Sequence, residues 1–566
     1  MSKTIAEGHA CMREAISDLV SHSAFVAGQF HEPLRSEADA SRFATNVSLI
    51  AARVISIWLV VLIGCDSSAP KPIPPVSTST TKGITSAEDE AILRRLCTQC
   101  HLYVEPSVLP VKEWEAAIPR MAQMPGYGRT IPRRLETTAI MQWFRERAPE
   151  TLTFADRSAL PIQTPPLKRV SLRQPPSKDF PFVSQVRIVT HPETKERSLL
   201  TSDMHSGWIC EAKMSSDPLA PLSLRLLSDQ CSHAVRTQSV DLDGDGRMEL
   251  LVSNLGSFAA MDHNLGSVDW LRPTESGFEK VVLADNFGRV ADIKPFDFDG
   301  DGDLDLAVAE FGWRLSGHVL LLENTTRKGG SSRTPQYTPR TLDERHGAVQ
   351  VEITDIDGNG RPDVIALLAQ EHEMLVAYLN LPDGSFKARE LFRAPHAVWG
   401  YSGFQLLDFD GDQDLDVLIT NGDMMDGPTI KPFHSVAWLE NVGEMKFVEH
   451  TLAELPGAHR AEAADLDGDG DFDIVACMLV PSGADRQAER QGSKLPPALV
   501  WLEQTEPLKF QLHVWERGPG RYATLTTGDF DGDGQTDVVL GVGRWQKPET
   551  GEEHTGDVEL WLSSGK

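Results

Sequence analysis

The sequence contains no apolar run long enough to span a bilayer. The longest such run, Val54 to Ile63, has ten residues, whereas a membrane-crossing helix needs about 20. Positive charge is also scarce, because 54 Lys and Arg stand against 82 Asp and Glu, a formal net charge of −28. Such a field repels phosphate backbones, so nucleic acid is not an expected partner. A chain of 566 residues, 40% of them hydrophobic, should instead fold into two or more domains.

Recognisable catalytic motifs are absent as well. The sequence holds no nucleophile elbow, phosphate-binding glycine loop, zinc-binding helix or distinct pair of catalytic carboxylates. We therefore expect no catalytic residue.

A short export signal is indicated near the N-terminus. Arg53 precedes the apolar run, which ends in the tetrad Leu62 to Cys65, and this arrangement is typical of secretory signals. The tetrad resembles a bacterial lipobox, which implies that Cys65 is lipidated and becomes the mature N-terminus. A buried core helix is the alternative, but the Pro/Ser/Thr-rich stretch that follows has nothing to pack.

Residues 1–65 are accordingly expected to be an N-terminal extension and a lipoprotein signal that is removed, and residues 66–84 a linker. Because export signals rarely begin with a long mixed-charge segment, we expect translation to start near residues 47–53. The mature protein would be a lipoprotein of the cell envelope that faces the periplasm or the cell surface. It would touch the membrane through its lipid anchor only.

Residues 85–150 contain Cys97-Thr98-Gln99-Cys100-His101. Two thiols about one helical turn apart can form thioethers with the vinyl groups of haem, and the adjacent imidazole can bind the iron. A zinc site would need two more ligands, and a thioredoxin-like site a βαβ context. The segment resembles small bacterial cytochromes c, which implies one covalent haem c held by Cys97, Cys100 and His101.

Three short helices are expected around this motif. Ser86 and Asp89 form a capping-box pattern at the start of the first. The apolar residues of the three helices would shield a porphyrin: Ile92, Leu93 and Leu96; Trp114, Ala117 and Ile118; Leu135, Ile140, Trp143 and Phe144.

The resemblance also implies a second axial ligand from a later loop. No histidine occurs from 102 to 150, which leaves Met121, Met124 and Met141. We favour Met124, because Met124-Pro125-Gly126 has the composition of a loop. An iron bound by His101 alone is the alternative, and it would favour ligand binding over electron transfer.

From about residue 180 the chain repeats itself. Six acidic segments begin at Asp241, Asp297, Asp355, Asp408, Asp465 and Asp529, at intervals of 56, 58, 53, 57 and 64 residues. Each is followed by an apolar β-rich run and then by a second strand-like piece. About four short strands per repeat is the content of a propeller blade. A degenerate unit at 185–209 precedes the six, so we expect seven blades over residues 180–566, after a linker at 151–179.

Each acidic segment follows D-x-D-x-D-x-x-x-D or a close variant. Oxygen ligands at positions 1, 3, 5 and 9, around a turn permitted by glycine, are what Ca²⁺ prefers. The segments resemble the calcium-binding FG-GAP and VCBS repeats of integrin-like propellers, which implies up to six Ca²⁺ ions. The expected ligands are Asp241, Asp243, Asp245 and Glu249; Asp297, Asp299, Asp301 and Asp305; Asp355, Asp357, Asn359 and Asp363; Asp408, Asp410, Asp412 and Asp416; Asp465, Asp467, Asp469 and Asp473; and Asp529, Asp531, Asp533 and Asp537. Asn359 replaces an acid, and Gln413 replaces the second glycine of its loop, so that loop is expected to be strained or weak.

Two further patterns leave alternatives open. Cys210 and Cys231 could form a disulfide in an exported protein or remain buried thiols. Basic residues recur before the strands that enter the acidic segments: His233, Arg236, Arg289, His346, His459, Arg460 and Arg521, with Trp313-Arg314 and Arg544-Trp545 after two segments. They could form a cationic, aromatic pocket for a carboxylated or sulfated glycan, or each could pair with a nearby aspartate.

Taken together, the sequence predicts a mainly β protein, in which a small all-α cytochrome c-like domain precedes a seven-bladed β-propeller. We expect an exported mono-haem electron-transfer lipoprotein whose propeller docks a redox partner protein or an anionic ligand. The alternatives are an oxidoreductase in which the propeller oxidises a substrate and passes electrons to the haem, and a pure adhesion or binding module.

Overall fold

The computed structural model describes residues 83–563 except 125–134, 156–159, 164–166, 176–179, 193, 215–220, 327–333, 425–428, 481–495, 519 and 545–555. The expected lipobox with Cys65, and most of the linker, therefore lie outside the described residues. Pro125, Gly126 and Trp545 lie outside them too. Within the described part, no helix is both long enough and apolar enough to cross a membrane.

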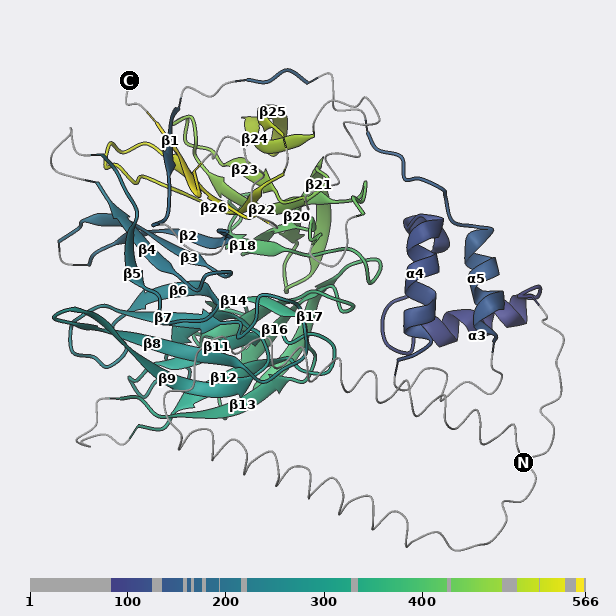
Figure 1. Ribbon diagram of the computed structural model, residues 1–566, viewed down its shortest axis with the longest axis horizontal. Coiled ribbons are helices and arrows are strands. Elements are labelled where there is room, and N and C mark those ends of the chain that lie inside the picture. The colour runs from purple at the N-terminus through teal and green to yellow at the C-terminus, as the bar shows by residue number, and fades with distance from the viewer. Residues whose placement is uncertain are drawn as a thin grey trace, which may run out of the picture. The chain divides into compact units, whose positions relative to one another are not determined.

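The N-terminal part of the described chain is helical, as expected. It contains α3 (Ala87–Cys97), the 3₁₀ helix η1 (Pro106–Val108), α4 (Val111–Met121) and α5 (Thr137–Arg145) (Figure 1). The capping box at the start of α3 is confirmed: the Ser86 hydroxyl accepts from the Asp89 N–H, and the Asp89 carboxylate accepts from the Ser86 N–H. These two hydrogen bonds satisfy two backbone donors and fix the start of the helix. The helix then runs for 11 residues and ends at Cys97.

The helices pack through the apolar residues that the sequence pattern selected. Trp114 of α4 and Phe144 of α5 contact each other with ring centroids 4.4 Å apart, and Leu93 of α3 is fully buried in the same cluster. The indole N–H of Trp114 donates to the carbonyl oxygens of Pro106 and Leu109 at 2.9 and 3.1 Å. These bonds tie the loop after the cysteine motif to α4.

The remainder forms seven four-stranded antiparallel sheets, the blades of a propeller. Blade 1 contains β2 (Val183–Thr190), β3 (Arg197–Asp203), β4 (Ile209–Lys213) and β5 (Arg225–Ser228). Blade 2 contains β6 (Ala234–Val240), β7 (Glu249–Asn254), β8 (Gly266–Thr274) and β9 (Gly277–Phe287). Blade 3 contains β10 (Val290–Phe296), β11 (Asp305–Glu310), β12 (His318–Asn324) and β13 (Tyr337–Asp343). Blade 4 contains β14 (Ala348–Thr354), β15 (Asp363–Leu368), β16 (Met374–Asn380) and β17 (Phe386–Arg393).

The last three blades continue the series. Blade 5 contains β18 (Gly403–Leu407), β19 (Asp416–Thr420), β20 (Ser435–Asn441) and β21 (Phe447–Glu454). Blade 6 contains β22 (Ala458–Ala464), β23 (Asp473–Met478), β24 (Pro497–Glu506) and β25 (Lys509–Arg517). Blade 7 contains β26 (Tyr522–Gly528), β27 (Asp537–Val542), β28 (Val558–Leu562) and, from the other end of the domain, β1 (Lys168–Leu172). The expected number of blades is confirmed.

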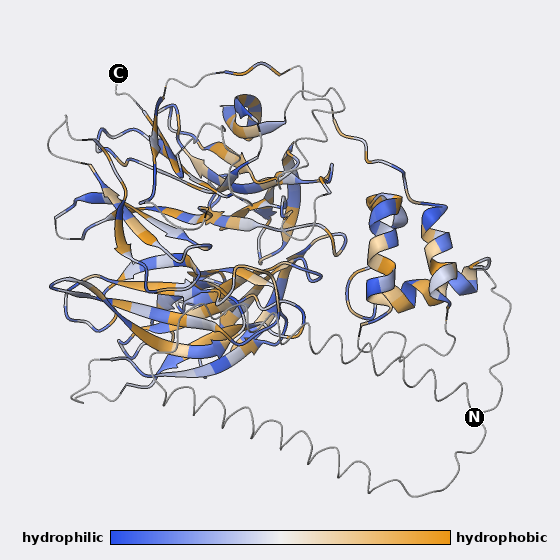
Figure 2. Cartoon of the chain, in the orientation of Figure 1, coloured by the Kyte–Doolittle hydropathy of each residue, from blue (hydrophilic) through white to orange (hydrophobic). Residues whose placement is uncertain are grey.

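Each blade is an up-and-down meander whose first strand contacts the first strands of its neighbours. The second strands that follow the six acidic segments, such as β7 and β11, are buried along their whole length. Hydrophobic residues recur along the strands (Figure 2). The cores lie between adjacent blades, as where Ala307 and Val319 of blade 3 pack with Val364 of blade 4. Removal of this surface from water is the main term that holds the ring together.

Ring closure differs from the expected arrangement. We expected the propeller to start at residue 180, after a linker at 151–179. Instead β1, upstream of that boundary, is the fourth strand of blade 7 and pairs with β28 from Lys168↔Leu562 to Leu172↔Val558. The lone strand KRVSL carries no acidic repeat, so the repeat pattern could not reveal it.

The two cysteines whose state was open are free thiols. Cys210 lies in β4 and Cys231 precedes β6, and both are buried. Burial raises the pKa of the Cys210 thiol to about 12, which keeps it protonated and unreactive.

Candidate functional site

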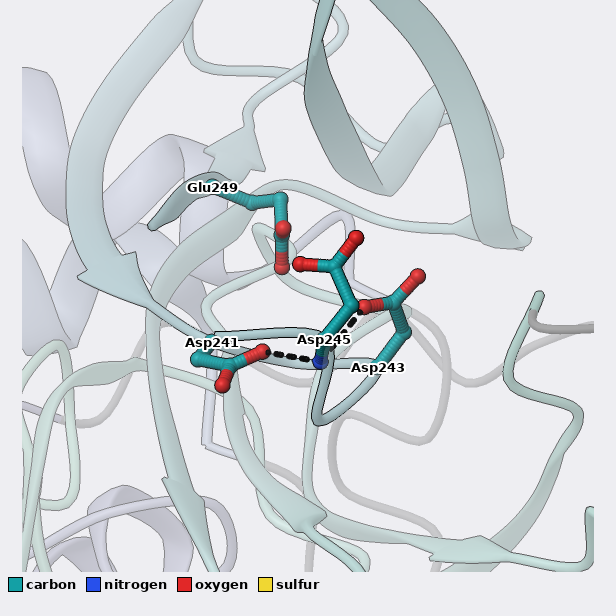
Figure 3. A group of neighbouring side chains, drawn as sticks. All are labelled: Asp241, Asp243, Asp245 and Glu249. Carbon is teal, nitrogen blue, oxygen red and sulfur yellow. Dashed lines mark hydrogen bonds between the residues drawn. The ribbon is translucent and has the colours of Figure 1, made fainter. Parts of the chain in front are cut away.

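The six acidic loops join the first and second strands of blades 2 to 7. In the first loop, the side chains of Asp241, Asp243, Asp245 and Glu249 converge (Figure 3). One oxygen of each lies within 4.8 Å of the others. The Asp245 N–H donates to Asp241 Oδ1 at 3.0 Å and to Asp243 Oδ1 at 3.2 Å. The backbone thus wraps around the carboxylates and points them inward.

The turn depends on glycine at the fourth and sixth positions of the loop. Gly244 and Gly246 have φ values of +69° and +86°, a region that side chains with a Cβ rarely adopt. In this conformation the Gly246 N–H donates to Asp241 Oδ2 at 3.0 Å. The glycines therefore allow the first aspartate to be held by the loop itself.

The same convergence recurs along the ring. Carboxylate oxygens within 4.8 Å of one another come from Asp297, Asp299 and Asp305; Asp355, Asp357 and Asp363; Asp408, Asp410 and Asp416; and Asp465, Asp467 and Asp469. In the first three of these groups the acids at positions 1, 3 and 9 meet, and position 5 is not part of the group. In the fourth group, positions 1, 3 and 5 meet and Asp473 stays outside. The expected ligands are thus brought together loop by loop, though not all four in each.

The acid at position 9 has a structural role besides. In every loop its second carboxylate oxygen accepts the N–H of position 2, at 2.8 to 3.3 Å. In blades 3 to 7 its first oxygen accepts the N–H of a residue near the end of the third strand, at 2.7 to 2.9 Å. This carboxylate therefore connects its loop to the body of the blade.

These position-9 acids are almost completely buried, at most 2% exposed. Burial raises the pKa of Asp305 to about 7 and the pKa values of Asp363 and Asp473 to about 6, with the loop aspartates Asp299 and Asp357 contributing repulsion in the first two cases. A divalent cation would offset both effects, because it neutralises the charge that burial penalises.

Family models match this part of the chain. A model described as FG-GAP-like repeat matches residues 297–366 and 355–419, and a model described as FG-GAP repeat matches residues 522–558. These ranges contain the loops that begin at Asp297, Asp355, Asp408 and Asp529. These parts of the propeller are similar to FG-GAP repeats. The propeller's aspartate clusters are consistent with the Ca²⁺ sites of such blades.

No curated protein matches the chain. Among solved structures, the crystal structure of an ancestral GH74 enzyme aligns with a TM-score of 0.44 and 10% sequence identity. The alignment covers 68% of this chain and 48% of that enzyme, so the chain spans about half the length of the enzyme it matches.

Two FG-GAP loops depart from the pattern, as the sequence indicated. Asn359 keeps the oxygen of position 5, since its Oδ1 accepts the Arg361 N–H at 2.8 Å, as Asp245 Oδ1 accepts from Arg247 at 2.9 Å. Gln413 adopts the glycine conformation with φ of 78° and keeps the hydrogen bond to Asp408 Oδ2 at 3.1 Å. The expected strain in this loop is confirmed as an unfavourable backbone conformation.

One set of residues that support the FG-GAP loops was missed from the sequence. Asn324, Asn380 and Asn441 end the third strands of blades 3, 4 and 5. Their side-chain amides donate to the carbonyl oxygen of loop position 8 at 3.2 to 3.3 Å. The recurring endings LLEN, AYLN and WLEN were a visible signal, but their purpose depends on the pairing of strands far apart in the chain.

The cysteine motif lines a cavity in the helical part. Its walls include Cys97, Cys100, His101, Met121 and Met124, and also Leu96, Gln99, Val104, Trp114, Ile118, Ile140 and Phe144. The empty space is about 690 Å³ including the open mouth. Met141 instead packs against the helical core. Two of the three candidate methionines thus share one cavity with the motif.

The two ring nitrogens of His101 differ in their hydrogen bonding. Nδ1 lies 2.7 Å from the carbonyl oxygen of Leu102, so the proton resides on Nδ1 and Nε2 remains an acceptor. Burial raises the pKa of the Cys97 thiol to about 11, which keeps it a neutral thiol. The donor set is therefore two thiols, one imidazole nitrogen and thioether sulfur atoms, in an apolar setting.

Most of the recurring basic residues of the propeller have partners within the chain. Arg236 Nη1 lies 2.7 Å from Asp292 Oδ2, Arg521 Nη2 lies 3.0 Å from Glu516 Oε1, and His346 Nε2 lies 3.0 Å from Glu371 Oε2. Arg460 Nη1 donates to Gln350 Oε1 at 2.7 Å. These partners lie outside the acidic loops, in other parts of the blades.

Proposed function

We propose that the chain is an exported, lipid-anchored electron-transfer protein. A haem domain at residues 85–150 would carry single electrons, and an FG-GAP propeller with up to six bound Ca²⁺ ions would serve as the docking platform. Cys65 would carry the lipid and hold the protein at the membrane surface. The observation that carries the proposal is the cavity that brings Cys97, Cys100, His101 and a methionine together between apolar walls.

The residues around this cavity fit a haem c. Addition of each thiol S–H across one vinyl group of the porphyrin would form two thioether bonds with no atom lost. His101 is held by its Nδ1 contact with Leu102 at 2.7 Å, so Nε2 is the atom available to an iron. Trp114, Ile118 and Phe144 would exclude water from the ring faces. When bound, the haem would supply reversible one-electron chemistry.

Met124 is proposed as the second axial ligand. It lies at the end of the described segment after α4 and lines the same cavity as His101. Met121, the last residue of α4, is the nearest competitor, since it lines the cavity too. A thioether ligand opposite an imidazole raises the reduction potential of the iron and closes its sixth position, which favours electron transfer over the binding of external ligands.

The haem proposal is tested by the optical spectrum of protein made in a host with cytochrome c assembly. We expect covalently attached haem on a denaturing gel and a six-coordinate low-spin spectrum in both redox states. Cys97→Ala with Cys100→Ala should abolish covalent attachment, whereas Cys210→Ala should not. Met124→Leu should convert the spectrum to five-coordinate high-spin, with Met141→Leu as the matched control. Wild-type protein without covalent haem would refute the proposal.

An anionic partner would dock at the end of the propeller opposite the acidic loops. His233 and Arg289 precede the first strands β6 and β10. The Nδ1 atoms of His205 and His233 lie 2.8 and 3.0 Å from backbone carbonyl oxygens. The Nε2 atom of each ring therefore points away from that backbone contact. Burial lowers the pKa of His233, and His205 and Arg289 add to this effect, so His233 is a neutral imidazole. The permanent charge of the Arg289 guanidinium is what supports an anion-docking role.

The docking proposal is tested with a carboxylated and a sulfated polysaccharide as probes. We expect Arg289→Ala to weaken binding of the preferred probe at least tenfold, while Arg521→Ala, whose arginine pairs with Glu516, should bind as the wild type does. Circular dichroism would establish that both variants are folded. Equal binding by Arg289→Ala and wild type would overturn this assignment. Substrate-dependent reduction of the haem in the absence of other proteins would instead support the oxidoreductase alternative.

A further inference from the structure

A cation from a neighbouring blade lies at the FG-GAP loop of blade 7. Arg197 Nη2 lies 3.0 Å from Oδ2 of Asp529, the first acid of that loop. Arg197 begins β3 of blade 1, the blade that has no acidic loop. Blades 1 and 7 are neighbours, since β2 contacts both β26 and β27. The ion pair therefore crosses from the first blade of the ring to the last.

The guanidinium group of Arg197 lies over the loop and not only beside one carboxylate. A Cβ atom added to Gly532, at the fourth position of the loop, would come within 2.9 Å of Arg197 Nη1. The guanidinium group therefore faces both the first acid and the fourth residue of the loop.

The blade 7 loop is otherwise built like the rest. The N–H groups of Gly532 and Gly534 donate to Asp529 Oδ1 and Oδ2 at 2.6 and 3.1 Å. The corresponding bonds in the blade 6 loop, from Gly468 and Gly470 to Asp465, are 2.7 and 3.1 Å. Among the described residues, the position-1 aspartates of the other five loops form no ion pair; they are Asp241, Asp297, Asp355, Asp408 and Asp465.

We propose that Arg197 competes with Ca²⁺ for the blade 7 loop and weakens that site, an inference that rests on calcium binding by the FG-GAP loops. A guanidinium and a divalent ion about 5 Å apart repel each other enough, even in water, to weaken binding at least about tenfold. At low Ca²⁺ the arginine neutralises Asp529 and links blade 7 to blade 1. As Ca²⁺ rises, the metal takes over that aspartate.

Arg197 thereby makes occupancy of the blade 7 site respond to the Ca²⁺ concentration outside the cell. The responsive site lies where the ring closes, so its occupancy changes the contact between the first and last blades. The other five sites each lie within one blade between its first and second strands, and a cation there leaves the closing contact unchanged.

Bound calcium per chain, measured by flow dialysis over a range of free Ca²⁺, tests the proposal on the full-length protein. Asp529→Asn should remove one binding step, which identifies the step of the blade 7 site. In Arg197→Gln that step should move to at least about tenfold lower free Ca²⁺ than in wild type. Arg225→Gln is the matched control, because Arg225 pairs with Glu211 in the same blade and is 70% exposed; its curve should match the wild type.

The double variant completes the cycle. In the Asp529→Asn background, Arg197→Gln should leave the remaining steps unchanged, because its effect acts through the blade 7 loop. A thermal melt in saturating Ca²⁺ would establish that each variant is folded. Superimposable curves for wild type and Arg197→Gln would overturn the competition by Arg197 while leaving calcium binding intact. Wild-type protein that binds no Ca²⁺ at all would overturn the proposed function as well.

Discussion

Calcium affinity of the propeller should fall steeply on acidification, and the loops should differ in how steeply. The position-9 carboxylate must lose its proton before it can bind a metal. With a pKa of about 7 in the metal-free fold, Asp305 is half protonated near neutrality, whereas Asp363 and Asp473, with pKa values of about 6, are mostly ionised there. Blade 3 should therefore be more sensitive to pH than blades 4 and 6.

The size of the effect follows from proton competition at one group per site. Between pH 7 and pH 5, a pKa of about 7 weakens Ca²⁺ binding roughly 50-fold, and a pKa of about 6 weakens it roughly tenfold. These factors correspond to about 2.3 and 1.4 kcal/mol of binding free energy. The sign is the one expected for raised acidic pKa values: each such group stabilises the metal-free fold fully below its unfolded pKa of 3.8. That contribution is lost as the pH rises through the folded value.

Isothermal titration of chelator-treated protein with Ca²⁺ at pH 5, 6 and 7 measures these factors. Thermal melts with and without Ca²⁺ at the same pH values give the matching change in stability. Buried histidines such as His396 and His459, whose pKa values burial lowers to about 4 and 3, destabilise both forms on acidification, and their effect cancels in the difference. A shift in melting temperature on adding Ca²⁺ that is the same at pH 5 and pH 7 would refute the reasoning.

Three further outcomes follow from the propeller. Gln413→Gly should raise the free energy of unfolding by about 1 kcal/mol, because it relieves the backbone strain of a non-glycine residue at φ 78°. Gln535→Gly, at a position without positive φ, should not stabilise the protein. Denaturant melts of both variants check this. Arg169→Gln should cost about 3 kcal/mol in the same assay, since it leaves the fully buried Glu559 without its 3.0 Å ion pair; a loss no greater than that of Arg225→Gln would contradict this. Asn441→Ala should weaken the blade 5 calcium site severalfold in flow dialysis, because the loop loses the bond from Nδ2 to Leu415 at 3.3 Å; unchanged affinity would show that the amide serves the strand alone.

The sequence was sufficient to predict features that repeat along the chain or that depend on neighbouring residues. The six acidic loops and the capping box at Ser86 each depend on residues within about ten positions of one another, and the seven blades follow from a repeat of 53 to 64 residues; all are confirmed. The expectation of Ca²⁺ followed from the same regularity, because carboxylates at alternate positions of a glycine turn have few other uses.

What could not be predicted depends on residues that meet only after folding. β1 pairs with β28 almost 400 positions away, and Arg197 meets Asp529 from a blade without an acidic loop. The basic residues looked like one pocket in the sequence, yet Arg236 is paired with Asp292 across two strands of adjacent blades. No periodicity marks such partners, because each occurs once.

The register of Lys168 with Leu562 also sets the order of events during biogenesis. The first strand of the propeller to leave the ribosome, β1, cannot find its neighbour until β28, the very last one, has been synthesised. Throughout that interval β1 has no partner strand and presents an unsatisfied edge, a template for pairing with other chains. Folding of this protein should therefore depend on holding chaperones more than its finished ring would suggest.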